Sequence, residues 1–180
     1  MPKILMKATA DVFALVQDVL AEEYPPIARL SPGLTIEILF ALSDTAAPAL
    51  AKNGYPCAGI IKVVSEEARA AGGPDILLLL DGDRWPSWTE EERYSLIHHE
   101  LHHLVPVKLR VDPDNRDAFT CDLDGLGRPK VRLRRHDFEV GGFNVIVERY
   151  GESCFEWQLI KRVHDAFDQQ LLPFAKGVAS

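Results

Sequence analysis

The chain has 180 residues, of which 47% are hydrophobic and 26% are charged, and its formal net charge is −7. This length suits one domain with a hydrophobic core, and the proportions are those of a soluble globular protein. The negative charge argues against a protein built to lie on DNA or on an anionic membrane, so we expect a single domain over residues 1–180.

The sequence carries no pattern for export or membrane insertion. The residues after Met1 lack the cationic start, apolar run and cleavage site of a signal peptide. Apolar runs such as residues 76–80 are far shorter than a membrane helix requires. The three cysteines are an odd number at wide spacing, which favours reduced thiols. The sequence therefore predicts a cytoplasmic protein with no membrane partner.

The first half of the chain shows one helical pattern followed by strand patterns. Apolar residues recur at helical spacing over residues 8–24, and Pro25 and Pro26 end this predicted helix. Short β-branched runs predict strands over residues 34–42 and 58–64. Residues 75–80 are apolar on both faces, which predicts a central strand. We expect a small sheet with helices packed on it.

A second helix has a clear start at Thr89. Thr89 is followed three residues later by Glu92, which is the spacing of a capping box. Glu90, Glu91 and Glu92 also place negative charge at the positive end of the helix dipole. The pattern predicts that this helix continues to about residue 105 and ends at Pro106.

The rest of the chain predicts a hairpin and two further helices. Asp124–Gly125 indicates a turn between strands over residues 119–123 and 130–133. Helices are predicted over residues 143–150 and 154–172, ended by Gly151 and Pro173. The predicted fold class is therefore α+β, with a short mixed β-sheet, an N-terminal helix, the helix that begins at Thr89, a β-hairpin and C-terminal helices.

The helix that begins at Thr89 holds four histidines within six residues, His98, His99, His102 and His103. Residues 99–103 form an H-E-x-x-H motif. Residues four apart share one face of a helix, so His99 and His103 can bind one Zn²⁺ while Glu100 approaches the metal-bound water. The motif predicts a zinc site with Glu100 as the catalytic base.

His98 and His102 are also four residues apart, and a helical wheel decides between the two pairs. At about 100° per residue, His99 and His103 lie opposite the apolar stripe, with Glu100 about 60–100° from them. Glu100 points roughly 160° or more away from His98 and His102. We therefore predict His99 and His103 as ligands. His98 and His102 are expected to be half-buried and hydrogen-bonded, with a supporting or substrate-contacting role for His102 as the alternative.

A catalytic zinc usually takes three ligands from the protein. The metzincin extension is absent, because Pro106 and Leu109 stand where that motif has glycine and histidine. His136 is the favoured third ligand, since it follows a predicted strand and opens a new segment, and Glu139 is the alternative. The other downstream candidates are Asp137, Glu148 and His164.

The chemistry expected of such a site is hydrolysis. Zn²⁺ lowers the pKa of its bound water towards ~7 and polarises the scissile carbonyl, while Glu100 takes the proton and passes it to the leaving amine. Tyr150 and His102 are candidate donors to the oxyanion. A peptide or protein substrate is expected to lie extended, as a strand added to the edge of the sheet. The alternatives are a catalytically weak module that binds DNA or a protein partner, and a zinc hydrolase of a non-peptide amide or ester.

Charge is unevenly distributed along the chain. Residues 1–105 hold 8 basic and 15 acidic residues, whereas residues 106–136 hold 8 basic and 5 acidic ones. Within the second range four cations alternate, which places them on one face of a strand: Arg128, Lys130, Arg132 and Arg134. We favour a solvated outer face for this basic strip. The alternative is a surface for an acidic substrate or for nucleic acid.

Three blocks of the sequence together resemble the phage metallopeptidase family and, more distantly, the SprT-like zincins. The blocks are Gly59–Lys62; Pro74–Leu77 with Trp85 and Glu92–His103; and Arg134–Glu139 leading to Val147–Gly151. The resemblance covers roughly residues 8–151. It implies a zincin-like domain of phage or prophage origin that acts as a zinc-dependent peptidase.

The resemblance also implies roles for particular residues. His99 and His103 correspond to zinc ligands, Glu100 to the catalytic base, and His136 to the third ligand of SprT-like proteins. The sequence departs from the family pattern in two places. His98 and His102 replace the usual Asp and Cys, and residues 140–142 interrupt the pattern before Phe143, which implies a later start for the following helix.

Overall fold

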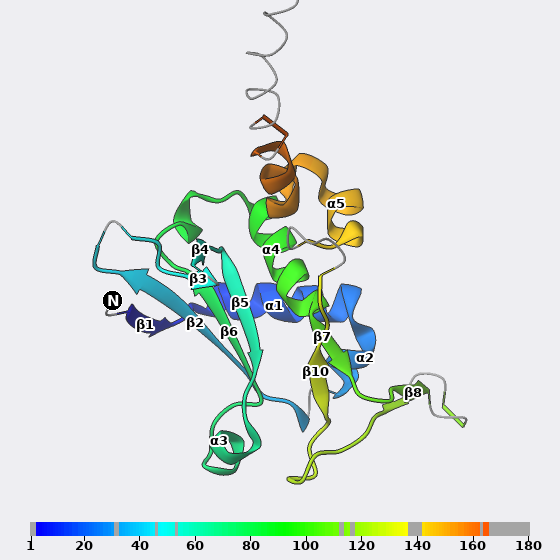
Figure 1. Ribbon diagram of the computed structural model, residues 1–180. Coiled ribbons are helices and arrows are strands. Elements are labelled where there is room, and N and C mark those ends of the chain that lie inside the picture. Colours follow the sequence, from blue (N-terminus) through cyan, green and yellow to red (C-terminus); the bar gives the residue numbers. More distant parts are fainter. Residues whose placement is uncertain are drawn as a thin grey trace, which may run out of the picture. The chain divides into compact units, whose positions relative to one another are not determined.

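The structure is a computed structural model that describes residues 3–30, 33–45, 47–52, 54–111, 114–115, 118–136, 142–162 and 164–165. The chain divides into two compact units, residues 1–135 and residues 136–180. Figure 1 shows the helices and strands of both units. The single domain that we expect over residues 1–180 stays a prediction.

A mixed four-stranded sheet organises the first unit, with strand order β1-β2-β6-β5. β2 (Ile36–Ser43) lies between β1 (Lys3–Lys7), to which it is antiparallel, and β6 (Ile76–Asp81), to which it is parallel. β5 (Gly59–Val63) pairs antiparallel with β6 and forms an edge of the sheet. β6 is buried along almost its whole length, which confirms the central strand that its apolar run predicts.

Two elements near the N-terminus are additional to the predicted ones. β1 is an edge strand on which Ile4, Leu5 and Met6 are each about half exposed. Neither face of the strand is buried, so its sequence lacks the alternation of apolar and polar residues that predicts a strand. α1 (Ala10–Glu23) ends just before Pro25, as predicted. A short helix, α2 (Pro25–Leu30), then begins at that proline, because proline is well tolerated in the first turn of a helix.

The connections between the sheet strands also form small elements. β3 (Ala51–Lys52) and β4 (Tyr55–Pro56) make a short antiparallel pair before β5. The neighbouring Ala49 and Leu50 pack against Ala41 and Leu79 and so cover one face of the sheet. α3 (Glu66–Ala70) connects β5 to β6, and the Ser65 hydroxyl accepts a hydrogen bond from the Ala68 amide at 3.4 Å.

The helix predicted from Thr89 is α4 (Glu90–His102), which follows a short 3-10 helix, η2 (Trp85–Ser87). The capping box is confirmed, because the Glu92 amide donates to the Thr89 hydroxyl at 3.2 Å and the Thr89 amide donates to the Glu92 carboxylate at 2.8 Å. The helix ends earlier than predicted. Residues 104–106 form β7 (Leu104–Pro106), which pairs with β10 (Val131–Leu133), so strand pairing overrides the helical apolar spacing there.

The predicted hairpin is correct in its turn and wrong in its strands. The Gly127 amide donates to the Asp124 carbonyl at 3.1 Å, and Leu123 and Pro129 form a bridge across the turn. However, β9 (Phe119–Thr120) pairs with β8 (Arg110–Val111), and β10 pairs with β7. The partner β7 carries two buried residues, and it therefore offers β10 an apolar surface that β9 lacks.

The described part of the second unit is helical. α5 (Asn144–Tyr150) follows Phe143 at its N-cap and ends at Gly151, whose φ of 50° suits glycine, and η3 (Gly151–Ser153) follows. Phe143, Ile146 and Cys154 form a buried cluster. The final predicted helix is helical from residue 155 to 162, and its end lies outside the described residues. In the part of the chain that the structure describes, no helix is both long and apolar enough to cross a membrane.

Candidate metal centre

The last turn of α4 carries the H-E-x-x-H residues. The ring centroids of His99 and His103 are 5.3 Å apart, with the rings inclined at 77°. His99 is half-buried, whereas His103 and Glu100 are buried, at 7% and 4% exposure. α4 therefore presents two adjacent imidazoles and a carboxylate in a sheltered environment.

The backbone of Arg134 orients His103. The Nδ1 atom of His103 lies 2.8 Å from the Arg134 carbonyl, and the Arg134 amide donates to the His103 carbonyl at 2.8 Å. Because a carbonyl only accepts, Nδ1 is the donor and the lone pair remains on Nε2. The contact is a product of the β7–β10 pairing, which the sequence alone did not predict.

Burial holds His103 in its neutral form. The loss of solvation on burial is the largest effect, and the pKa of His103 is lowered to about 4. The hydrogen bond to the Arg134 carbonyl acts in the opposite direction, and the nearby positive charges of His99, Lys52 and Arg134 lower the pKa further. Neutral imidazole is the form that binds a metal ion, and an Nδ1–H bonded to a carbonyl is the usual support for a ligating Nε2.

His136 lies beside His99 and His103. One ring nitrogen from each of the three histidines lies within 4.8 Å of the others. His136 is only two residues beyond Arg134, whose amide and carbonyl are both bonded to His103, so chain continuity brings it there. Its ring also packs against Phe143, at 5.0 Å between centroids. Three imidazole nitrogens are a donor set that fits a catalytic zinc ion.

Gly59, the first residue of β5, makes room for Glu100. A Cβ atom at position 59 would lie 2.7 Å from Oε1 of Glu100 and 3.0 Å from its Cγ and Cδ atoms. The carboxylate therefore lies directly against the edge strand. Sequence reasoning did not give Gly59 this role, although a glycine that opens a strand often marks a close approach.

His98 and His102 point towards Tyr24, at the end of α1. The Tyr24 hydroxyl lies 2.8 Å from Nδ1 of His102, and it donates to the His98 carbonyl at 3.2 Å. His102 is half-buried, and His98 is more deeply buried than predicted, at 3% exposure. A supporting role of His102 in catalysis stays a prediction.

The other candidate residues lie elsewhere or outside the described structure. Glu139 and Asp137 fall outside the described residues. Tyr150 is the last residue of α5 in the second unit, where the Arg149 guanidinium lies 5.6 Å from its ring centroid. Glu148 also belongs to α5, and His164 is exposed.

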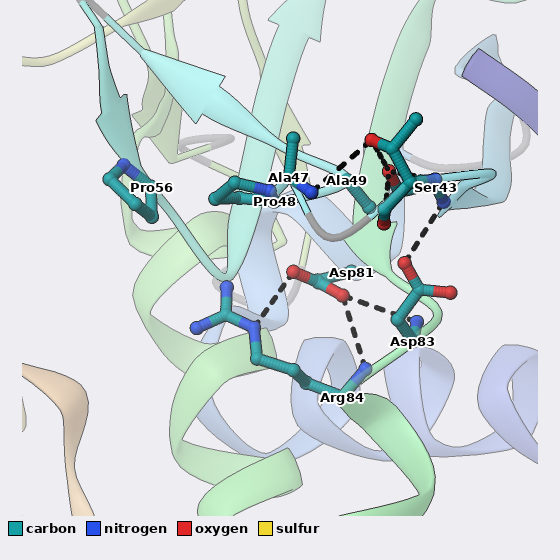
Figure 2. A pocket seen from close by; sticks show the side chains of 9 residues that line it. Ser43, Ala47, Pro48, Ala49, Pro56, Asp81, Asp83 and Arg84 are labelled. Atoms are coloured by element: carbon teal, nitrogen blue, oxygen red, sulfur yellow. Dashed lines mark hydrogen bonds and ion pairs between the residues drawn. The ribbon is translucent and has the colours of Figure 1, made fainter. Parts of the chain in front are cut away.

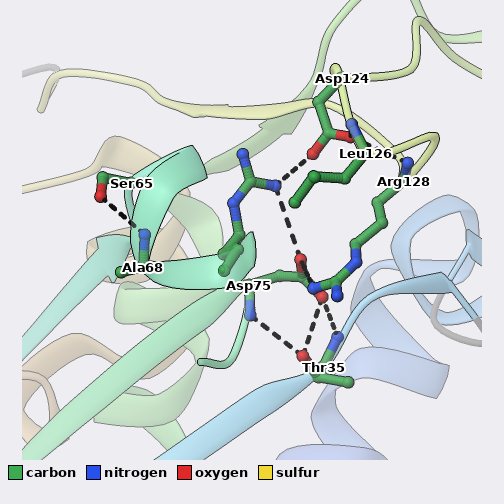
Figure 3. A network of polar contacts seen from close by, with 8 residues as sticks. Thr35, Ser65, Ala68, Asp75, Asp124, Leu126 and Arg128 are labelled. Atoms are coloured by element: carbon green, nitrogen blue, oxygen red, sulfur yellow. Dashed lines mark hydrogen bonds and ion pairs between the residues drawn. The ribbon is translucent and has the colours of Figure 1, made fainter. Parts of the chain in front are cut away.

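The predicted basic strip is wrong at Arg128, which belongs to the polar network of Figure 3. Arg128 donates to the Asp75 carboxylate at 2.9 Å, and Thr35 donates to the same carboxylate through its amide and its hydroxyl, both at 2.8 Å. Arg69 contacts both Asp75 and Asp124. Burial alone would raise the pKa of Asp75, but the hydrogen bonds from Arg128 and Thr35 outweigh burial and lower it. Arg128 thus ties the turn after β9 to the sheet.

A separate cavity of about 400 Å³ lies at the carboxyl ends of the parallel strands β2 and β6 (Figure 2). Its charged groups bond to one another and to the backbone. Asp81 accepts from Nε of Arg84 at 2.8 Å, and Asp83 accepts from the Ser43 amide at 2.9 Å. None of the three clustered histidines lines this cavity.

A mixed sheet with an H-E-x-x-H helix, a third histidine and a buried glutamate is the arrangement of a metallopeptidase. A family model described as "Putative phage metallopeptidase" matches residues 5–168, and the chain belongs to this family. No curated protein and no solved structure matches the chain. The family match confirms the resemblance that the sequence motifs indicate.

Proposed function

We propose that the protein is a zinc-dependent peptidase in which His99, His103 and His136 bind the metal and Glu100 is the general base. The observation that carries the proposal is the convergence of three imidazole nitrogens within 4.8 Å, beside a buried carboxylate. Membership of a metallopeptidase family supports hydrolysis of peptide bonds as the reaction.

The protein's own groups have distinct tasks in this proposal. Zn²⁺, when bound, supplies Lewis acidity to the substrate carbonyl and acidifies water. The Glu100 carboxylate, held against Gly59, accepts the proton of the attacking water and transfers it to the leaving amine. The Arg134 carbonyl keeps His103 in the tautomer whose Nε2 carries the lone pair for the metal.

The edge strand β5 is the proposed binding surface for the substrate backbone. β5 begins at Gly59, next to Glu100, and it packs against α4. An extended peptide that pairs with a sheet edge gains main-chain hydrogen bonds without regard to its sequence. Such pairing would bring a peptide bond close to the Glu100 carboxylate.

The Glu100→Gln variant tests the role of the base. It should retain one Zn²⁺ per chain and lose peptide hydrolysis by at least about 100-fold, because the amide cannot accept the proton. Zinc content by atomic absorption and cleavage of an unfolded protein substrate are the two measurements. A Gln variant with wild-type activity contradicts the proposal.

Two further variants identify the third ligand in the same measurements. His136→Ala should lower both zinc content and hydrolysis, whereas Glu139→Ala should retain zinc. His164→Ala is the matched control, because this histidine is exposed on the last described helix. The reverse result, with zinc lost only from Glu139→Ala, assigns the third position to Glu139.

A further inference from the structure

The charged side chains on the strands around Glu100 are of one sign. β3, β5 and the stretch that includes β10 carry only basic charges: Lys52, Lys62, Lys130, Arg132 and Arg134. We call these five residues the basic rim. They stand out because the chain as a whole has a net charge of −7.

The basic rim lies beside the proposed metal centre. Gly59 places the start of β5 against Glu100, and Lys62 is exposed three residues further along the same strand, where it points to the opposite face of the sheet. β10 packs against β5. Because Val131 is buried, its alternating neighbours Lys130, Arg132 and Arg134 point to the opposite side of the strand.

One end of the basic rim lies next to His103. Arg134 is bonded to His103 through its backbone, with its carbonyl 2.8 Å from Nδ1 of His103. The basic rim therefore borders the space that a substrate of the metal centre would occupy.

The nearby carboxylates are engaged in other contacts. Asp122 forms an ion pair with Lys108 at 2.9 Å, and Asp124 forms one with Arg69. Asp75 binds Arg69 and Arg128 in the buried network. Among the described residues, Lys52, Lys62 and Arg132 form no ion pair, so their charge is left for a ligand.

We propose that the substrate is an acidic polypeptide segment whose Asp and Glu side chains contact the basic rim on either side of the scissile bond. This inference rests on the proposed function and names its substrate class. Side chains of a strand paired with β5 alternate between the two faces of the sheet, and opposite charges on adjacent strands attract. A polypeptide is favoured over nucleic acid, because only a polypeptide can use the main-chain groups of an edge strand.

Three matched peptides test the proposal. They share one length and one apolar centre and carry Glu, Gln or Lys at the flanking positions. Binding is measured by fluorescence anisotropy with zinc-loaded Glu100→Gln protein, and cleavage with the wild type. We expect the Glu peptide to bind about tenfold more tightly than the Gln peptide, from a few cross-strand pairs. The difference should shrink as salt is raised.

Charge-neutralised variants locate the effect. Lys62→Gln with Arg132→Gln should remove the preference for the Glu peptide over the Gln peptide. Lys7→Gln is the matched control, since Lys7 lies on β1 at the other edge of the sheet and pairs with Glu37 at 3.3 Å. This control should retain the full preference.

The outcomes separate the two proposals. Equal binding of the three peptides by zinc-loaded protein overturns the acidic substrate and leaves the peptidase in place. Failure to cleave any peptide or any unfolded protein overturns the peptidase. Tighter binding of a single-stranded oligonucleotide than of the Glu peptide, lost in the double variant, overturns the acidic polypeptide in favour of nucleic acid.

Discussion

Glu100 is a buried carboxylate whose position depends on a glycine in a neighbouring strand. Its oxygen would meet a Cβ atom at position 59 at 2.7 Å, and its Cγ and Cδ atoms would meet it at 3.0 Å. The whole end of the side chain is thus in contact with the backbone of β5. A buried side chain that is confined in this way holds its carboxylate in one place, as a general base requires.

Gly59→Ala tests this contact. The added methyl group should displace Glu100 and destabilise the fold by about 1–3 kcal/mol, the usual cost of overpacking. Hydrolysis should fall while zinc content is retained. Urea unfolding provides the stability, and a double-mutant cycle provides the control, because Gly59→Ala should cost much less in the Glu100→Ala background. Equal costs in the two backgrounds would contradict the contact.

His103 shows how two short strands position one proposed metal ligand. The β7–β10 pairing brings the Arg134 carbonyl to Nδ1 of His103, and His136 follows two residues later. This hydrogen bond thus determines the tautomer of His103, and it also holds the chain at Arg134, two residues before the proposed ligand His136. His103 and Arg134, which form this hydrogen bond, are 31 positions apart in the sequence.

At the scale of the element, α4 is stabilised at its start by the capping box and ends where β7 begins. The reciprocal hydrogen bonds of Thr89 and Glu92 satisfy amides that the first turn would otherwise leave unpaired. Its other end is determined by tertiary pairing, because Leu104 enters a strand with Leu133 opposite it. Two of the three proposed ligands, His99 and His103, lie at this end of the helix, where it joins the strand.

Thr89→Ala measures the contribution of the cap. We expect a loss of about 1 kcal/mol in the free energy of unfolding, since the hydroxyl that accepts a hydrogen bond from the Glu92 amide is lost. Ser65→Ala on α3 is the matched control and should cost less, because its hydrogen bond is longer, at 3.4 Å, and its helix has only five residues. Urea unfolding of the two variants compares them, and a larger loss for Ser65→Ala contradicts the argument.

At the scale of the whole molecule, the network around Asp75 joins segments that are distant in sequence. Asp75 precedes β6, Thr35 precedes β2, and Arg128 belongs to the turn that leads into β10. The side chain of Asp75 is 1% exposed. Arg69 and Arg128 therefore share one buried carboxylate as a partner. The contact between Arg128 and Asp75 attaches β10, the strand before His136, to the main sheet.

Acid titration tests this network. The pKa of Asp75 lies below its ordinary value of 3.8 in the folded protein. Its ionised form therefore stabilises the fold above the ordinary value, and this stabilisation is lost as the pH falls through the lowered pKa. Asp75→Asn should cost about 1–3 kcal/mol at pH 7, because Arg128 loses its buried carboxylate partner while Arg69 keeps Asp124.

The control for this variant uses the same measurement at low pH. Stability of the wild type and of Asp75→Asn, from urea unfolding between pH 7 and pH 2, should converge as the wild-type carboxyl becomes protonated. Asp83→Asn is the comparison variant outside the network, because Asp83 follows β6 whereas Asp75 precedes it. A constant difference between Asp75→Asn and wild type at all pH values would contradict the assignment.

The sequence by itself determined the features that local patterns encode. The 3.6-residue apolar period indicated α1, the continuous apolar run indicated β6 as a central strand, and Thr89 with Glu92 indicated the start of α4. The H-E-x-x-H spacing and the motif blocks indicated the metallopeptidase family, which is confirmed. These features depend on residues within a few positions of one another, so they can be read without the fold.

Only the tertiary structure decided which distant segments meet. It ended α4 at β7, paired β10 with β7 in place of β9, and removed Arg128 from the basic strip by burying its contact with Asp75. It also placed Gly59 against Glu100 and gathered Lys52, Lys62 and Arg132 on neighbouring strands. The physical reason is that strand partners and buried ion pairs form between whichever surfaces the folded chain brings together, and no local periodicity records that choice.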